Sequence, residues 1–186
     1  MKKIIKNEFN EHLKVANSIY SITDDVAASA KLCIDCLKNN GKILLFGNGG
    51  SAADAQHIAA EIVGRYKEKR KALPAIALTT DSSALTAIGN DFGFLQIYTR
   101  QVEALANKGD ILIAISTGGA SDNVNNALKL AKKLGCKSIG LSGRDGGEFN
   151  KNCDINILVP AEDTPRIQEM HILIGHTICH LIDQAF

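Results

Sequence analysis

The sequence lacks features that would direct the chain to nucleic acid or to a membrane. Lysine and arginine total 21 and aspartate and glutamate 20, so the formal net charge is only +1. Phosphate-backbone binding relies on concentrated basic charge, and the dense basic cluster at 67–71 is interpreted as a solvated loop in preference to a binding patch. No apolar run approaches the roughly 20 residues of a membrane span. We therefore expect no nucleic-acid or membrane partner.

Secretory and disulfide signals are also lacking. The basic start MKK leads into an interrupted amphipathic pattern instead of an apolar signal core, which predicts a cytoplasmic protein. The five cysteines form no even disulfide framework. Cys33 and Cys36 make a CxxC inside a helical pattern, where core packing is favoured over redox or metal chemistry. No linker or repeat divides the 186 residues, so we expect one domain over 1–186.

Residues 1–40 have the periodicity of two amphipathic helices. Thr23 is a plausible cap of the second helix, and the turn at 39–41 would end it. We expect the two helices to pack as an N-terminal helical hairpin, a natural element of subunit contact, ahead of an α/β core over 41–186. The apolar positions at helical spacing are Ile5, Phe9, Leu13, Ala16 and Tyr20, then Val26, Ala30, Cys33 and Leu37.

The core alternates short apolar runs with helical patterns. Five runs rich in Ile, Leu or Val, separated by helices, predict a mostly parallel sheet that is covered on both faces. The five expected strands are 43–46, 75–78, 111–115, 138–141 and 155–159.

The stretch 42–64 combines a strand, a glycine turn and a helix. In the turn at 47–51 the glycines allow close approach of a ligand, Ser51 can cap the helix, and unpaired N–H groups face any anion. Farther along, His57 and Glu61 are four residues apart and therefore share one helix face. This element presents an anion cradle and a proton-transfer pair.

A second turn of this type, STGGAS at 116–121, follows the third expected strand. Ligands of open parallel sheets lie outside the carboxyl ends of the strands, so both turns should lie on the same rim. Either turn alone could serve only to cap a helix, whereas two together favour a phosphorylated ligand.

Other polar positions leave alternatives open. Asp81 is most simply a helix cap, and Asp91, in the turn 89–93, either orders that loop or faces the ligand. The turn 142–147 is interpreted as structural. Pro165 suits the first turn of the last helix. That helix also carries His171, His176 and His180, and the pattern does not reveal which of these histidines is catalytic.

Together these motifs resemble the bacterial phosphoheptose isomerases of the sugar-isomerase (SIS) superfamily. The resemblance spans essentially the whole chain and is carried by GNGGSAADAQH at 47–57, GRY at 64–66, GNDFG at 89–93, the loop at 116 and RIQEMH at 166–171. It implies a flavodoxin-like three-layer α-β-α sandwich with a five-stranded parallel sheet. It also implies homotetramers whose active sites lie between subunits.

The implied activity is an aldose-ketose isomerisation of sedoheptulose 7-phosphate to D-glycero-D-manno-heptose 7-phosphate through an enediol. The product would feed ADP- or GDP-heptose synthesis for lipopolysaccharide or related surface glycans. The implied acid/base pair is Glu61 and His176, and one zinc ion per subunit would be held by His57, Glu61, Gln168 and His176. The implied substrate-binding residues are Asn48, Gly49, Gly50, Ser51, Arg65, Asp91, Ser116, Thr117, Gly118, Ser121 and Gln168.

These residue types suit the reaction, because a carboxylate and an imidazole can share proton transfers next to a carbonyl that zinc would polarise. Gln168 and His176 are eight residues apart, about 12 Å along a helix. This separation favours metal ligands from different copies of the chain, and hence an interfacial site.

Two further points bear on function. The family loop usually reads Ser-Thr-Ser-Gly followed by a polar residue, whereas Gly118 and Ala120 stand here, and one lost phosphate hydrogen bond would cost ~1–3 kcal/mol. The alternative function is a tetrameric, non-catalytic SIS scaffold that binds the replication initiator protein. That paralogue resembles this chain but lacks the acid/base pair, and because Glu61 and His176 are both present we favour the enzyme.

Overall fold

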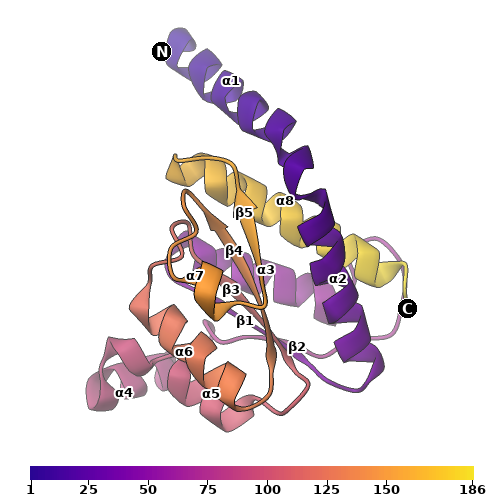
Figure 1. Ribbon diagram of the computed structural model, residues 1–186, viewed down its shortest axis with the longest axis vertical. Coiled ribbons are helices and arrows are strands. Elements are labelled where there is room, and N and C mark those ends of the chain that lie inside the picture. The colour runs from indigo at the N-terminus through magenta and orange to yellow at the C-terminus, as the bar shows by residue number, and fades with distance from the viewer.

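The computed structural model describes residues 1–186 and has a five-stranded sheet at its centre, in which every neighbouring pair is parallel (Figure 1). The strand order is β2-β1-β3-β4-β5. The predicted parallel sheet is confirmed, with β2 slightly shorter and β1 and β4 longer than expected. The strands are β1 (Ile43–Gly47), β2 (Ala75–Ala77), β3 (Ile111–Ile115), β4 (Lys137–Gly143) and β5 (Ile155–Val159).

Helices cover both faces of the sheet and complete the predicted three-layer α-β-α sandwich. Side chains of α2, α3 and α8 form the core on one face, and those of α5, α6 and α7 form the core on the other. The helices are α1 (Lys2–Ser18), α2 (Thr23–Lys38), α3 (Gly50–Val63), α4 (Ser82–Phe92), α5 (Thr99–Leu105), α6 (Asp122–Lys133), α7 (Phe149–Asn152) and α8 (Thr164–Asp183), with short 3-10 helices η1 (Ile19–Ile22) and η2 (Phe94–Gln96).

Strand β1 shows why its sequence is apolar without alternation. Ile43 and Leu45 point into the α2/α3/α8 core, while Leu44 and Phe46 point into the opposite core, and all four are fully buried. A strand buried on both faces needs apolar residues at every position. Each such side chain contributes about 1.5–3 kcal/mol relative to an exposed one.

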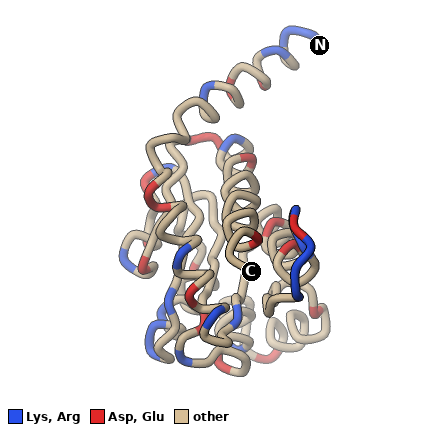
Figure 2. The backbone as a smooth tube through the Cα atoms, turned by 90° about the vertical axis from the view of Figure 1, so that its right-hand side faces the viewer, with Lys and Arg blue, Asp and Glu red and all other residues tan.

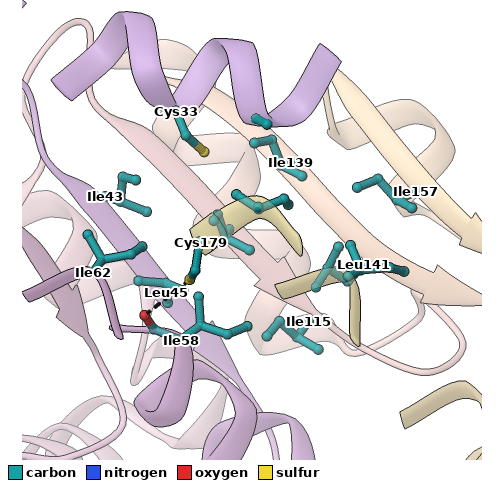
Figure 3. Packing of buried hydrophobic residues seen from close by; sticks show 14 of the residues in the cluster. Cys33, Ile43, Leu45, Ile58, Ile62, Ile115, Ile139, Leu141, Ile157 and Cys179 are labelled. Atoms are coloured by element: carbon teal, nitrogen blue, oxygen red, sulfur yellow. Dashed lines mark hydrogen bonds between the residues drawn. The ribbon is translucent and has the colours of Figure 1, made fainter. Parts of the chain in front are cut away.

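Cys33 and Cys36 pack in the core, as predicted. Figure 3 shows Cys33 and Cys179 among the aliphatic side chains of the α2/α3/α8 core. Both are completely buried, and Cys36 is 5% exposed. Burial raises the pKa of the Cys36 thiol to about 11, so the CxxC holds protonated thiols, which are poor nucleophiles and metal ligands.

The predicted N-terminal hairpin is wrong, although both helices exist. The backbone has right-handed helical angles at Ile19 (φ −66°, ψ −15°) and at Thr23 (φ −57°, ψ −42°), and the deviation between them at Ile22 (φ −106°, ψ 12°) does not reverse the chain. Thr23 is not a cap, because its hydroxyl donates to the carbonyl of Tyr20 at 2.8 Å. With no residue that reverses the chain, α1 extends away from the body instead of folding back on α2 (Figure 1).

The apolar stripe of α1 therefore has no partner within the chain over most of its length. Ile5, Phe9 and Leu13 are 46%, 65% and 56% exposed, and only Val15 near its end is buried. Figure 2 shows α1 extending from a body over which acidic and basic residues are mixed.

Other helix ends agree with the sequence. Asp81 Oδ1 accepts a hydrogen bond from the Ala84 amide at 2.9 Å and caps α4, Asn39 ends α2, and Pro165 lies in the first turn of α8. None of the helices combines the length and the apolar character that a membrane-spanning segment requires.

Candidate active site

The two glycine-containing loops lie side by side at the carboxyl edge of the sheet, as predicted. Gly47 at the end of β1 pairs with Ile115 at the end of β3, so the loops that follow are neighbours. Between them is a cavity of about 180 Å³ next to the starts of α3 and α6. Its lining is mostly hydroxyl and amide groups: Asn48, Ser51, Ile115, Ser116, Thr117, Ser121 and Gln168. Such groups at helix N-termini suit an anion.

Helix α3 begins differently from the prediction. The N-cap residue is Gly49, with φ +58° and ψ −122°, and the helix starts at Gly50. A positive φ favours glycine, which carries no Cβ. Ser51 is therefore inside the first turn and is not the cap. Its buried side chain lines the cavity instead.

Asn48 is held by a residue that the sequence did not single out. Asn48 and Asn123 exchange two amide hydrogen bonds, each 2.9 Å long. Asn123 is 3% exposed and lies in the first turn of α6. This pair joins the two loops and leaves Asn48 with one N–H and one oxygen lone pair for a ligand. An asparagine in a helical pattern gave no signal of this role.

The loop after β3 packs its backbone directly against the turn that follows β4. Gly119 has φ +63°, and a Cβ there would overlap the carbonyl oxygen of Gly146. A Cβ at Gly118 would instead lie 3.4 Å from Arg144 Nη1, an ordinary contact. Arg144 is held by the Glu162 carbonyl and the Thr164 hydroxyl, in agreement with the structural interpretation of this turn.

A second cluster forms where α3 packs on α8. Nε2 of His57 lies 3.2 Å from Nε2 of His176 and 3.2 Å from Oε1 of Glu61. Burial, and next the charge of His57, hold the pKa of His176 below its ordinary value, although Glu61 opposes this. His176 is therefore expected to be neutral near pH 7, the form that accepts a proton or binds a metal.

The structure also separates the three histidines of α8. His171 is buried and its Nε2 bonds the Ser142 carbonyl at 3.1 Å, while His176 alone of the three joins the cluster with His57 and Glu61. The residue pattern alone left this choice open, whereas the family resemblance pointed to His176.

The cluster fits a zinc ion. One donor atom each from His57, Glu61 and His176 lie within 4.8 Å of one another, and two nitrogens and a carboxylate are common zinc ligands. Two ligands of a tetrahedral zinc with bonds of about 2.0–2.1 Å lie roughly 3.3 Å apart, close to the 3.2 Å between the two imidazole nitrogens.

Gln168 lies apart from this cluster within one chain. It belongs to the hydroxyl-lined cavity, where a Cβ on Gly50 would lie 2.6 Å from its Nε2. His57 is two helical turns, about 10 Å, beyond Gly50 on α3. A metal-ligand role for Gln168 would require a second copy of the chain and stays a prediction.

Arg65 and Asp91 lie outside both groups. Arg65 is exposed after α3, where its guanidinium donates to the Lys67 carbonyl at 3.4 Å. Asp91 is not in a loop, because α4 continues to Phe92, and its carboxylate accepts from Asn90 at 2.8 Å. Their contacts with substrate stay predictions.

Comparison with known proteins finds relatives over nearly the whole chain. The SIS domain family matches residues 9–143. The phosphoheptose isomerase of Aliarcobacter butzleri (strain RM4018) is 61% identical over 184 residues, which cover 98% of this chain and 97% of that protein. Two solved structures are similar throughout. A phosphoheptose isomerase from Neisseria gonorrhoeae has 44% identity, a TM-score of 0.92 and 98% coverage of both chains. One from Francisella tularensis has 39% identity, a TM-score of 0.95 and coverage of 98% and 97%.

Proposed function

This chain belongs to the phosphoheptose isomerases of the SIS-domain family, and on that premise we propose that it converts sedoheptulose 7-phosphate to D-glycero-D-manno-heptose 7-phosphate. The observation that carries the proposal is the cluster of Glu61, His57 and His176 beside a hydroxyl-lined cavity on the same pair of helices. The product would supply nucleotide-activated heptose for surface glycans such as lipopolysaccharide.

The reaction moves a hydrogen and a carbonyl between neighbouring carbons. A base removes a proton from C1 of the ketose, an enediol forms, and a proton returns to C2 as the carbonyl moves to C1. Glu61 and His176 share these transfers. The lowered pKa of His176 keeps it able to accept a proton near neutral pH. A zinc ion held by His57, Glu61 and His176 would polarise the carbonyl.

The cavity at the carboxyl edge of the sheet would hold the phosphate. Hydroxyls of Ser51, Ser116, Thr117 and Ser121 surround it, and the positive ends of α3 and α6 favour negative charge there. Gly118 contributes only its backbone. Anchoring the phosphate orients the rest of the sugar without taking part in the proton transfers.

We propose a homotetramer in which subunits share active sites. Two features support this proposal. The apolar stripe of α1 is exposed in the isolated chain, and Gln168 lies too far from the His57 cluster to join it within one chain.

The test is conversion of sedoheptulose 7-phosphate in deuterated water by purified protein, before and after chelation and after zinc is added back. NMR follows the reaction, and we expect it to show the aldose product with solvent deuterium at C2. Loss of turnover on chelation and its return with zinc would establish the metal requirement. A folded oligomer that turns over no substrate in any arm would contradict the proposal and favour the scaffold function or another sugar phosphate.

A further inference from the structure

Tyr66 packs against the proposed acid/base cluster, although nothing in the sequence gave it a role beyond the GRY motif. Its ring is stacked on the imidazole of His176, with centroids 5.2 Å apart and planes 19° from parallel. The ring of His180, one turn farther along α8, has its centroid 6.2 Å from that of the Tyr66 ring. His176 also meets His57 edge to face at 4.9 Å. Two rings from other elements therefore contact the imidazole of His176.

The segment that carries Tyr66 is fastened to the end of α8. The buried carboxylate of Asp183 accepts hydrogen bonds from the amides of Lys67 and Glu68 at 2.6 and 2.9 Å. It also accepts from Nε of Arg70 at 2.6 Å. The side chains of Arg70 and Asp183 are 1% and 0% exposed. Burial alone would raise the pKa of Asp183, but these donors together lower it below its usual range, so the pair is ionic.

Arg70 also binds the end of α3. Its guanidinium donates to the carbonyl oxygens of Glu61 and Ile62 at 3.0 and 2.9 Å. These are among the last carbonyls of α3, which no helical amide can satisfy. One buried ion pair thus joins the three segments that carry Glu61, Tyr66 and His176.

We propose that Tyr66 is a positioning residue for His176, and that the Arg70–Asp183 pair holds it there. The inference rests on the proposed function, in which His176 transfers a proton and contributes a metal ligand. The stacked face of Tyr66 stops the imidazole from rotating, so that Nε2 stays directed at His57 and Glu61. Misplacing a reacting group by about 1 Å can cost on the order of 100-fold in rate.

The matched variants are Tyr66→Phe, which keeps the ring, and Tyr66→Leu, which keeps the apolar volume but removes stacking. Phe186→Leu is the control, because Phe186 is an aromatic residue that is 46% exposed and lies beyond the end of α8. In the isomerase assay we expect Tyr66→Leu to lower kcat about 10- to 100-fold with little change in KM, while Tyr66→Phe and Phe186→Leu stay within about twofold of wild type. If Tyr66 had only a structural role, Tyr66→Leu would lower the thermal stability of the protein and leave kcat unchanged.

Two readouts do not depend on turnover. In the NMR spectrum of the metal-free protein, the ring protons of His176 should carry an aromatic ring-current shift that Tyr66→Phe keeps and Tyr66→Leu removes. Co²⁺ is a suitable metal probe, because nitrogen and carboxylate donors also bind this ion. Titration with Co²⁺, followed by its visible absorption, should show about tenfold weaker binding for Tyr66→Leu, since His176 is then no longer held in place, and unchanged binding for the other variants.

The outcomes separate the two proposals. Unchanged His176 shifts, unchanged Co²⁺ affinity and unchanged kcat in Tyr66→Leu would overturn the positioning role while leaving the isomerase intact. A wild-type protein that fails to isomerise sedoheptulose 7-phosphate, but whose His176 shifts and Co²⁺ affinity change in Tyr66→Leu, would overturn the proposed function and leave the positioning role standing.

Discussion

Glu61 and His176 are the residues at which chemistry and folding can be separated. The side chain of Glu61 is 25% exposed and that of His57 49%, so the cluster adds little to the core. We expect Glu61→Gln and His176→Gln each to lower kcat by about 10²–10⁴-fold, because each removes a proton-transfer group. The same NMR assay measures the rate, and circular dichroism checks the fold.

The matched control is Glu103→Gln, an exposed carboxylate on α5 that pairs only with Arg100 at 3.0 Å. It should turn over substrate like wild type. Near-wild-type rates in both cluster variants would rule out the acid/base assignment.

His171 gives the protein a pH-dependent stability that is unrelated to the site chemistry. Burial lowers the pKa of His171 to about 4, and its Nδ1 has no hydrogen-bond partner. In the unfolded chain this histidine takes up its proton near pH 6.5, so falling pH stabilises the unfolded state before His171 of the folded state can be protonated. The contribution of His171 to the free energy of unfolding is therefore fully present above pH 6.5. Roughly 3 kcal/mol of it is lost between pH 6.5 and 4.

Urea unfolding at a series of pH values measures this loss, with His171→Gln as the comparison. The variant should have a flatter profile between pH 6.5 and 4. Parallel profiles for wild type and variant would show that His171 is not the responsible group.

At the scale of elements, the loop after β3 offers a paired test of the phosphate cavity. Gly118 has room for a side chain and an ordinary φ, whereas Gly119 has φ +63° and no room for a Cβ. Gly118→Ser should fold normally and bind inorganic phosphate about five- to tenfold more tightly, because one hydrogen bond is worth about 1 kcal/mol. Gly119→Ser should be destabilised.

Calorimetric titration with phosphate and thermal unfolding distinguish these effects. Phosphate affinity for Gly118→Ser at or below the wild-type value would mean that position 118 does not face the anion.

Elements were predictable where their own residues determine them. The run 111–115 coincides with β3 because a strand that is buried on both faces is apolar at every position. The run 155–159 coincides with the edge strand β5, in which Asn156 interrupts the apolar residues. Strand β4 extends beyond its apolar run because Ser142 and Gly143 pair with Leu158 and Val159, which local composition does not show. The start of α3 was misplaced because Gly49, with its positive φ, took the cap position from Ser51.

The site was predictable only in part for a similar reason. The His57–Glu61 spacing places both residues on one helix face, and the structure confirms that they meet. The amide pair of Asn48 and Asn123, and the stacking of Tyr66 on His176, depend on segments that are distant in sequence. No local pattern encodes such contacts.

At the scale of the whole molecule, α1 is the element that most needs a partner. Periodicity showed that α1 has an apolar face but not what covers it, and that is why the hairpin was expected. We expect the double variant Phe9→Ser and Leu13→Ser to convert the proposed tetramer into smaller species, since both side chains are more than half exposed in the isolated chain.

Light scattering coupled to size-exclusion chromatography measures the assembly. The control exchanges Glu11 and Lys14, exposed polar residues of the same helix, for serine. A double apolar variant that keeps the wild-type mass would mean that α1 does not hold the subunits together.

The position of α8 in the chain has a consequence for biosynthesis. This helix follows all other elements, yet it packs against both α2 and α3 and completes the larger core. While the ribosome is still making α8, the faces of α2 and α3 that it covers remain open to water, where they invite chaperones or aggregation. A chain ending at Asp163 should therefore bind an apolar dye strongly, whereas the full chain should not.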